Sequence, residues 1–305
     1  MADADGSAAR ALAPPGSAGG RRPGRGAWRA CRPRQWSKNI VVVLAPTAGG
    51  ALARSASVWE LCGAVAAFCL LSGATYLVND VRDREQDRLH PTKRHRPIAA
   101  GELSPLRALR LARALVGAGL VLAAIVRPAL AAAAIGYLVL TLSYSLWWRG
   151  VAVADIAAVA GGFVLRAVAG DVAAGVPPSR PFLVVTCACA VFLVVGKRHA
   201  ELLRGGIAAR RTLRRYSARE LRWLLLASAW LGCIAYACWA FARAGDELWL
   251  QLSLVPFAMW LHRYAQMVKA GAGEAPEALV LADPALLALG GCWAILFVGG
   301  LYVAR

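Results

Sequence analysis

Nine apolar runs recur along the chain, and polar or charged segments separate them. The runs lie near residues 40–53, 58–80, 105–126, 129–148, 152–173, 181–198, 221–242, 247–267 and 285–304. A helix needs about 20 consecutive apolar residues to cross a bilayer, so most of these runs are long enough, although the first and sixth are short. The pattern predicts an all-α, polytopic membrane protein with nine transmembrane helices.

Proline marks the beginning of several runs. Pro105, Pro128, Pro181 and Pro284 each fall near a predicted helix start. In the first turn of a helix the backbone N–H has no intrahelical partner, so a residue that lacks this group costs little there. These positions therefore indicate where the helices begin.

Composition agrees with a membrane protein. The chain has 305 residues, of which 59% are apolar, and its mean hydropathy is +0.52. It carries 35 Lys and Arg residues against 17 Asp and Glu, and such an excess indicates basic cytoplasmic loops in contact with anionic lipid. Membrane lipids are therefore expected partners. Nucleic acid is not, because no basic domain stands apart from the apolar runs. The 8 cysteines mostly lie within the runs and predict no disulfide framework.

The basic residues are distributed unevenly among the loops. Loops 82–104 and 197–222 are rich in Lys and Arg, and so is the segment before residue 40. Because Lys and Arg gather in cytoplasmic loops, we predict that the N-terminus, both loops, the turn near Arg149 and loop 263–284 face the cytoplasm. Nine spans then leave the C-terminus outside the inner (cell) membrane.

Two parts of the chain differ in composition. Residues 1–29 are rich in Ala, Gly, Pro and Arg and contain no apolar run. We predict that they form a disordered, basic cytoplasmic tail rather than a signal peptide. Residues 30–305 hold all nine runs and are predicted to form one transmembrane domain.

The most distinctive polar segment follows the second run, from Asn79 to Gly101. Asp80, Asp83 and Asp87 recur at i, i+3 and i+7, so they would share one face of a helix, and Asn79 lies one turn from Asp83. Carboxylates that converge at a membrane end suit Mg²⁺, which completes its coordination with water and phosphate oxygens. We therefore predict a Mg²⁺ site that binds a diphosphate. A solvated loop of mixed charge is the alternative.

Further polar residues fall at the ends of other runs, on the predicted cytoplasmic side. They are Lys38, Lys93, Arg96, Tyr144, Arg149, Asp155, Lys197 and Arg198. A base at the end of a span is commonly an interfacial anchor, and this alternative stays open for each one taken alone. Their shared side favours the polar mouth of a central cavity, where Lys and Arg would contact phosphate groups directly.

Arg166 lies far inside the fifth run. A charge within a membrane costs about 2.5–3.5 kcal/mol on insertion scales, so such residues usually face a cavity or a partner. We predict that Arg166 lines the cavity and contacts the substrate.

Several segments resemble a known family. NDVRDREQD after an apolar run, followed by LHPTKRHRPIAAG, resembles the first Asp-rich motif of the UbiA prenyltransferase superfamily. RPRQWSKNIVVVLAP, GGFVLRAVAG, GKRHAELL and GAGEAPEALVLAD are similar to its decaprenyl-phosphate phosphoribosyltransferase branch. The resemblance covers residues 30–304. It implies a bundle of nine helices around a central cavity that opens to the cytoplasm.

The branch implies a reaction and its reactants. The 5-phosphoribosyl group of phosphoribosyl diphosphate (PRPP) passes to a polyprenyl phosphate such as decaprenyl phosphate, and diphosphate leaves, with Mg²⁺ as cofactor. The product would serve the supply of decaprenyl-phosphoryl-arabinose for cell-wall arabinan, as in arabinogalactan. The resemblance also implies a homo-oligomer, such as a trimer.

On this interpretation the polar residues divide into roles. Mg²⁺ is bound by Asn79, Asp80, Asp83 and Asp87; ribose hydroxyls are held by Tyr144 and Asp155; phosphates are contacted by Lys38, Lys93, Arg96, Arg149, Arg166, Lys197 and Arg198. Asp80, Asp83, Tyr144 and Asp155 form the predicted catalytic set. Because the acceptor phosphate is already an anion, positioning and charge stabilisation are expected to carry catalysis without a strong general base.

Two features bear on the alternatives. Superfamily members that use a prenyl diphosphate carry a second Asp-rich motif after the sixth span, whereas Lys197–Glu201 here reads KRHAE and suits a terminal monophosphate. Arg149 stands where the family has a lysine, so a planar guanidinium replaces the point charge of an ammonium group. A prenyltransferase with an aromatic acceptor and a transporter for a phosphate-bearing solute are the alternatives. The transporter predicts related halves, and no repeat is evident.

Overall fold

The computed structural model describes residues 23–51, 55–148, 151–204, 215–243 and 248–302. Every regular element in these ranges is helical, which confirms the predicted all-α class. The elements are α1 (Pro23–Ala30), the 3₁₀ helix η1 (Pro33–Ile40), α2 (Val41–Ala48), α3 (Ser55–Arg82), α4 (Arg84–Leu89), the 3₁₀ turn η3 (Lys93–His95), α5 (Pro105–Val126), α6 (Pro128–Ser143), the π-helical η4 (Tyr144–Trp148), α7 (Ala152–Ala174), α8 (Arg180–Leu203), α9 (Ala218–Arg243), α10 (Trp249–Leu252), α11 (Leu254–Lys269), α12 (Pro276–Ala282) and α13 (Pro284–Tyr302).

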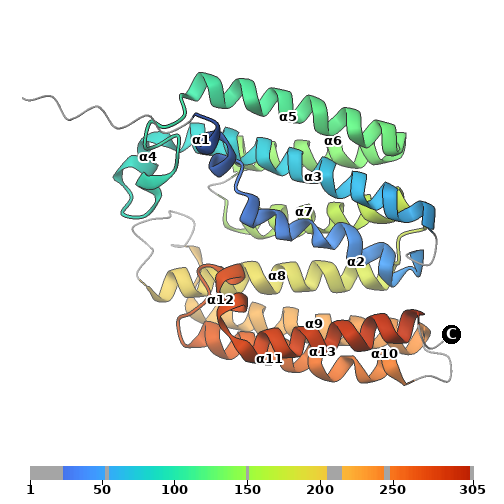
Figure 1. The fold of residues 1–305 in the computed structure, drawn as a ribbon. Coiled ribbons are helices and arrows are strands. Elements are labelled where there is room, and N and C mark those ends of the chain that lie inside the picture. Colours follow the sequence, from blue (N-terminus) through green and yellow to red (C-terminus); the bar gives the residue numbers. More distant parts are fainter. Residues whose placement is uncertain (1–22, 52–54, 149–150, 205–214, 244–247, 303–305) are drawn as a thin grey trace, which may run out of the picture.

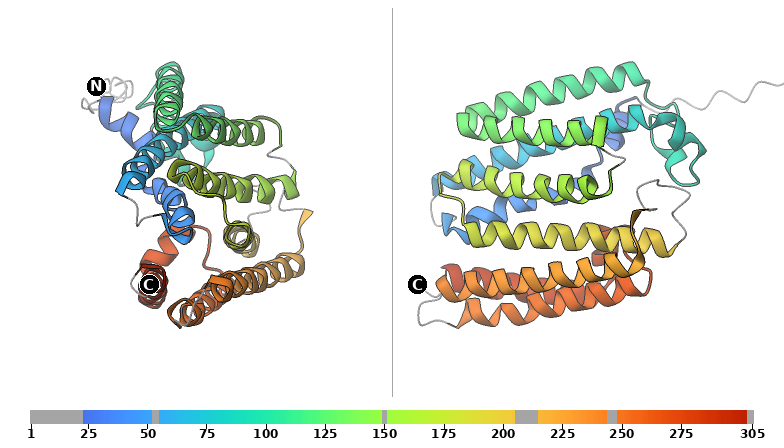
Figure 2. Two further views of the ribbon diagram at one scale, coloured as in Figure 1. Left: turned by 90° about the vertical axis from the view of Figure 1, so that its right-hand side faces the viewer. Right: turned by 180° about the vertical axis from the view of Figure 1, so that it is seen from behind.

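The long helices run back and forth beside one another as a bundle (Figure 1). α3 packs against α5, α2 and α6 against α7, α7 against α8, α8 against α9, and α11 against α13. The short elements α1, α4 and α12 gather at one end of the bundle, on the left of Figure 1, which we call the loop end. The view from behind shows the same separation of the loop end from the end where α13 finishes (Figure 2).

Seven helices in the described part of the chain are long and apolar enough to cross a membrane. They are α3, α5, α6 with η4, α7, α8, α9 and α13, so the chain is a multi-pass membrane protein. The predicted count of nine is not confirmed. The first predicted span contains α2, a helix of 8 residues that follows η1, and the eighth is divided into α10 and α11.

Proline explains the division of the eighth span. Pro256 lies in the first turn of α11 and has no N–H to donate back to the preceding turn. The buried Ser253 stands between α10 and α11, and its hydroxyl donates to the Leu250 carbonyl at 2.5 Å. The chain therefore continues in the same direction but does not form one uninterrupted helix.

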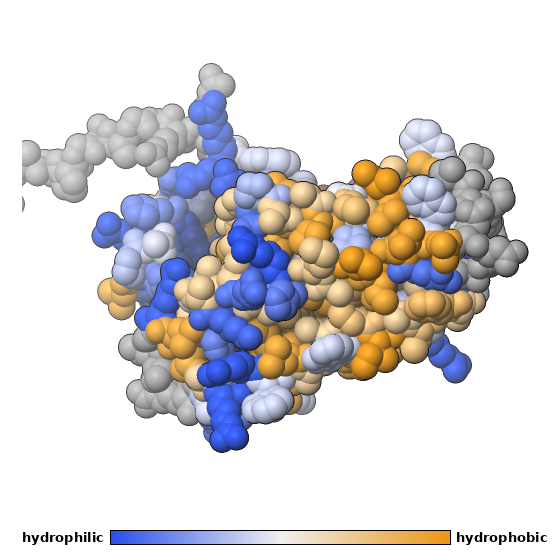
Figure 3. Space-filling model, turned by 90° about the horizontal axis from the view of Figure 1, so that it is seen from below, coloured by the Kyte–Doolittle hydropathy of each residue, from blue (hydrophilic) through white to orange (hydrophobic). Residues whose placement is uncertain are grey.

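The outer surface of the bundle is rich in large apolar side chains. Trp59, Ile125 and Ile295 are 81%, 76% and 71% exposed. Figure 3 shows an apolar surface over the middle and right of one face, with polar residues concentrated toward its left part. Because soluble proteins rarely expose so much contiguous apolar surface, this distribution fits a bundle surrounded by lipid.

Helix α1 begins at Pro23, inside the segment that the sequence predicts to be a disordered tail. Ala30 is fully buried, and the Trp28 ring meets Trp36 edge-on at 5.3 Å between centroids. Arg29 pairs with Glu102 at 3.0 Å. These contacts order the chain from Pro23 onward, while residues 1–22 lie outside the described residues.

Arg166 of α7 ties several helices together inside the bundle. Its side chain is buried, and its guanidinium donates to Asn39 Oδ1 at 2.8 Å, Gly162 O at 3.0 Å, Tyr137 Oη at 2.9 Å and Ser72 Oγ at 3.2 Å. The group also lies 4.6 Å from the centroid of the Tyr137 ring. Four of its roughly five N–H donors are thus used within the protein. Arg166 therefore fixes η1, α3 and α6 against α7.

We predict that Arg166→Met destabilises the bundle without altering its surface. The change leaves Asn39, Ser72 and Tyr137 without their donor, which should lower the free energy of unfolding by about 2–4 kcal/mol. Thermal unfolding in detergent, followed by tryptophan fluorescence, measures the effect.

Arg110→Met is the matched control, because Arg110 is exposed on α5. It should change the free energy of unfolding by less than about 0.5 kcal/mol. Equal effects of the two substitutions would contradict a structural role for the buried guanidinium.

Candidate active site at the loop end

The predicted site residues come from helix ends that meet at the loop end (Figure 1). η1, the end of α3, α4, η3, η4, the start of α7 and the end of α8 carry them. Arg149 lies outside the described residues. Arg166 lies about 16 Å along α7 from Asp155, since the two are eleven residues apart and each residue advances 1.5 Å. Arg166 therefore lies deeper along α7 than Asp155, where its side chain bonds to Asn39, the neighbour of Lys38. Its predicted contact with the substrate stays a prediction.

The Asp-rich segment keeps nearly helical geometry across a break. α3 ends at Arg82 and α4 begins at Arg84, yet Asp83 N donates to Asn79 O at 2.9 Å and Asp87 N donates to Asp83 O at 2.8 Å. Asp80, Asp83 and Asp87 are all buried. The backbone therefore keeps the helical spacing of these acids across the break.

Two arginines neutralise part of this acidic group. Arg32 Nη2 donates to Asp80 Oδ1, and Arg96 Nη1 lies 3.3 Å from the same oxygen and 2.6 Å from Asp87 Oδ2. Arg96 thus bridges Asp80 and Asp87. Among the described residues no three His, Cys, Asp or Glu side chains converge as a metal-binding group, so the set of three carboxylates expected from the spacing is not formed. A guanidinium lies between two of its members instead.

Two oxygens of the same segment are left without protein partners. Asn79 Oδ1 and Asp80 Oδ2 are buried and accept no hydrogen bond. Buried polar atoms are nearly always satisfied, and Mg²⁺ commonly uses one or two carboxylates together with water and substrate phosphates. These two oxygens therefore fit a divalent cation that is shared with a phosphate-bearing ligand.

A second buried cluster surrounds Asp155 at the start of α7. Tyr144 Oη donates to Asp155 Oδ1, and Arg198 Nε donates to Asp155 Oδ2 at 2.5 Å. Arg198 Nη1 also donates to Glu201 Oε2 at 2.5 Å. Arg198 was predicted to contact phosphate, but two carboxylates hold its buried guanidinium in this structure. In this structure Arg198 therefore pairs with Asp155 and Glu201, and its predicted contact with phosphate stays a prediction.

A third group joins residues that are distant in the sequence. Lys38 Nζ of η1 pairs with Glu277 Oε1 of α12 at 3.0 Å. Burial disfavours the ionised form of Glu277, but attraction and hydrogen bonding by Lys38, aided by Lys197, hold the pKa of Glu277 below its ordinary value. Lys38 and Lys197 are therefore close enough to act on one carboxylate, although η1 and α8 carry them separately.

The remaining predicted base is Lys93 of η3, whose backbone N–H donates to His90 Nδ1 at 3.4 Å. It stands three residues before Arg96, which places it at the edge of the Asp-rich segment.

Arg32 and Glu277 were absent from the site predicted by the sequence. Arg32 has a left-handed backbone with φ 53° and ψ 62°, the only positive φ of a non-glycine residue in the described ranges. Such strain costs about 1–3 kcal/mol and is common at functional sites. Arg32 is the first residue of the segment RPRQWSKN, and Glu277 is the last residue of the segment GAGEAPE. The sequence does not show that Arg32 pairs with Asp80 or that Glu277 pairs with Lys38.

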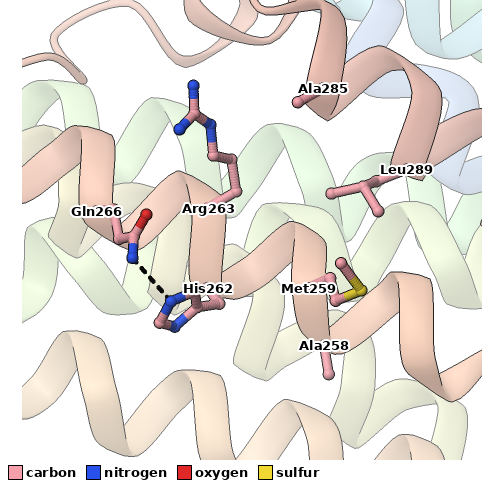
Figure 4. A pocket seen from close by; sticks show the side chains of 7 residues that line it. All are labelled: Ala258, Met259, His262, Arg263, Gln266, Ala285 and Leu289. Carbon is pink, nitrogen blue, oxygen red and sulfur yellow. Dashed lines mark hydrogen bonds between the residues drawn. The ribbon is translucent and has the colours of Figure 1, made fainter.

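An open groove on the outside of the bundle is separate from this group. It is lined by 7 residues of α11 and α13, and none of them belongs to the predicted site (Figure 4). Gln266 Nε2 meets His262 Nε2 at 2.8 Å, and Arg263 pairs with Asp283 at 2.8 Å. The groove is therefore a mostly apolar surface beside two helices, and none of the buried acids of the site lines it.

The sequence of the chain is similar to that of a known enzyme family. Residues 42–290 match the model of the UbiA prenyltransferase family. The chain is 40% identical to a decaprenyl-phosphate phosphoribosyltransferase of Corynebacterium glutamicum, over 90% of this chain and 86% of that protein. It is 39% identical to the Mycobacterium tuberculosis protein of the same description, over 88% of this chain and 91% of that one.

Solved structures show the same fold. A UbiA homolog from Archaeoglobus fulgidus, bound to GPP and Mg²⁺, superposes with a TM-score of 0.68 at 18% identity and covers 91% of this chain and 98% of its own. A UbiA homolog from Aeropyrum pernix gives 0.62 at 19% identity, over 88% and 98%. The chain therefore belongs to the UbiA prenyltransferase family, on the branch of the decaprenyl-phosphate phosphoribosyltransferases.

Proposed function

We propose that this protein transfers the 5-phosphoribosyl group of PRPP to decaprenyl phosphate and releases diphosphate. The observation that carries the proposal is the pairing of acids with two arginines and a lysine from other parts of the chain, at one end of an apolar bundle. A polyanionic donor needs such cations, and a lipid acceptor needs the apolar surface beside them. The identity to relatives described as decaprenyl-phosphate phosphoribosyltransferases supports these two substrates.

The donor diphosphate is assigned to the Asp-rich segment. Asn79 and Asp80 would hold Mg²⁺ through their unpartnered oxygens, with Asp83 beside them, and the cation would neutralise charge that develops on the leaving diphosphate. Arg32 and Arg96 would contact phosphate oxygens with the N–H groups that their carboxylate pairs leave over, because a guanidinium has five. Asp87 keeps Arg96 in place.

The sugar and its 5′-phosphate are assigned to the other two groups. Asp155 and Tyr144 would bind ribose hydroxyls. Lys38, Lys93 and Lys197 would contact phosphate as point charges, and Arg149 would add a planar guanidinium. In this assignment the bound donor would lie along the loop end, with its diphosphate at the Asp-rich segment and its 5′-phosphate nearer to α8.

The transfer itself requires no proton movement. An oxygen of the acceptor phosphate forms a bond to the anomeric carbon C1, while the bond between C1 and the diphosphate oxygen breaks and its electron pair leaves with diphosphate. Both the nucleophile and the leaving group are anions. The protein therefore contributes positioning and charge stabilisation rather than a general base.

The loop end is assigned to the cytoplasmic side of the cell membrane, because its loops carry most of the Lys and Arg residues. PRPP would then enter from the cytoplasm, and the decaprenyl chain would remain among the apolar helices. The product would supply decaprenyl-phosphoryl-arabinose for cell-wall arabinan. A homo-oligomer, such as a trimer, is part of the same proposal.

A prenyl diphosphate donor is less well supported. Such a donor favours a second acidic, metal-binding group at the end of the sixth predicted span. Lys197, Arg198 and Glu201 occupy that place at the end of α8, and Arg198 pairs with two carboxylates. The solved neighbours bound to prenyl diphosphates are under 20% identical and support the fold alone.

Labelled donors test the proposal directly. Membranes containing the protein are given polyprenyl phosphate, Mg²⁺ and either PRPP labelled in the ribose or a labelled prenyl diphosphate. Ribose label should enter the lipid fraction, and EDTA should abolish its entry. Incorporation of the prenyl label alone would contradict the proposal.

Asp80→Asn tests the metal assignment. The loss of one formal charge at the unpartnered oxygen should weaken Mn²⁺ binding, measured by electron paramagnetic resonance in the presence of PRPP. Turnover should fall at least about 100-fold, since a metal supplies several kcal/mol of charge stabilisation.

Asp283→Asn is the matched control for Asp80→Asn. Asp283 Oδ1 accepts the Leu286 N–H at 2.9 Å at the start of α13, and asparagine caps a helix nearly as well. Its Mn²⁺ binding and turnover should equal those of the natural protein. Equal loss in both variants would remove Asp80 from the metal site.

A further inference from the structure

Few buried polar side-chain atoms lack a hydrogen-bond partner in the described part of the protein. They are Asn79 Oδ1, Asp80 Oδ2, His199 Nδ1, Tyr216 Oη, Trp239 Nε1 and Tyr264 Oη. Native proteins satisfy most such atoms, so each exception requires an explanation, and a site for a ligand is one. Tyr216 is of special interest because it lies outside the helices, immediately before α9, and no role was predicted for it.

Local structure holds Tyr216 in place. Ser217 Oγ accepts the Glu220 N–H at 3.1 Å, and Glu220 Oε2 accepts the Ser217 N–H at 2.8 Å. This reciprocal pair is a capping box, in which Ser217 is the N-cap of α9. The Tyr216 ring packs against the apolar cluster that contains Ile156 and Leu221. A residue just before the N-cap often packs in this way against the residue that follows the box, which is Leu221 here, so both the capping box and the ring contact hold Tyr216 in place.

The hydroxyl of Tyr216 lies within the electrostatic reach of the Asp155 cluster. Burial and the Asp155 carboxylate raise the pKa of Tyr216, while Arg198 acts in the opposite direction. The phenol therefore keeps its proton at neutral pH and is a donor. Tyr144 and Arg198 donate to the two oxygens of Asp155, and within the described residues no group accepts the Tyr216 O–H.

The charge of the cluster selects the chemistry of its ligand. One guanidinium, Arg198, stands against two carboxylates, Asp155 and Glu201. A phosphate placed there would meet excess negative charge and would be repelled. A neutral sugar hydroxyl is favoured instead, because it can accept from a phenol and donate to a carboxylate at the same time.

We propose that Tyr216 contacts the donor substrate directly, and that its hydroxyl donates a hydrogen bond to a ribose hydroxyl of PRPP. The inference rests on the proposed function and adds a residue to it. Tyr216 would fix the ribose against Asp155, so that C1 is aimed at the acceptor phosphate.

Tyr216→Phe removes one oxygen atom and keeps the ring that packs against the apolar cluster. We expect kcat/KM for PRPP to fall about tenfold, because one lost hydrogen bond typically costs about 1 kcal/mol or slightly more and about 1.4 kcal/mol corresponds to a factor of ten. PRPP analogues that lack the 2′-hydroxyl or the 3′-hydroxyl identify the contacted group. With one of the two analogues the natural enzyme and Tyr216→Phe should have equal kcat/KM, because the bond is already absent.

Tyr302→Phe is the control, because Tyr302 Oη donates to the Thr47 carbonyl at 3.0 Å at the other end of the bundle. It should keep the natural kcat/KM, and thermal unfolding should show that both variants are folded. The inference is overturned if Tyr216→Phe keeps the natural kcat/KM, or if it loses the same factor with PRPP and with both analogues. An inactive natural enzyme with PRPP would instead overturn the proposed function, and the inference with it.

Discussion

Charged side chains buried in an apolar bundle must have partners, and this constraint determines the structure around the candidate site. Asp80, Asp155 and Arg166 are almost fully buried, and each would carry a large desolvation cost if it stood alone. Asp80 is neutralised by Arg32 and Arg96, and Asp155 by Arg198. Arg166 has neutral partners, since Asn39, Ser72 and Tyr137 accept its hydrogen bonds. Because each pair joins different helices, satisfying the charges also fixes the helices.

The same pairs prepare the loop end for a charged ligand. Arg32, Arg96 and Lys38 are held by carboxylates, so their positions are set before a substrate arrives, and less conformational entropy is lost on binding. Asn79 Oδ1 and Asp80 Oδ2 remain available to a cation. The arrangement therefore separates two tasks: cations and metal ligands near α3 suit a diphosphate, and the acid-rich group at α7 and α8 suits a sugar.

Local patterns in the sequence predicted much of the fold. The apolar runs with proline at their starts correspond to helices such as α5, which begins at Pro105 and ends at Val126 as expected. The basic loops were expected on one side, and the elements that carry them meet at one end of the bundle. The eighth span was predicted as one helix because hydropathy does not register the backbone break before Pro256.

The site was predicted less completely, for a physical reason. Spacing along a helix identified Asp80 and Asp87, but it could not show that Arg96 bridges them. The pairing of Lys38 with Glu277 joins η1 to α12, and no local pattern contains such a contact. Arg198 was assigned to phosphate from its charge alone, whereas its partners Asp155 and Glu201 are visible only in three dimensions.

The central claim is that Asn79 and Asp80 bind the donor's diphosphate through a divalent cation at the loop end. A cryo-electron microscopy map of the protein with PRPP and Mn²⁺ tests this claim most directly. The account predicts metal density beside Asn79 Oδ1 and Asp80 Oδ2, in contact with the diphosphate, and ribose density beside Asp155. Donor density at another place, such as the groove between α11 and α13, with none beside Asp80, would contradict it.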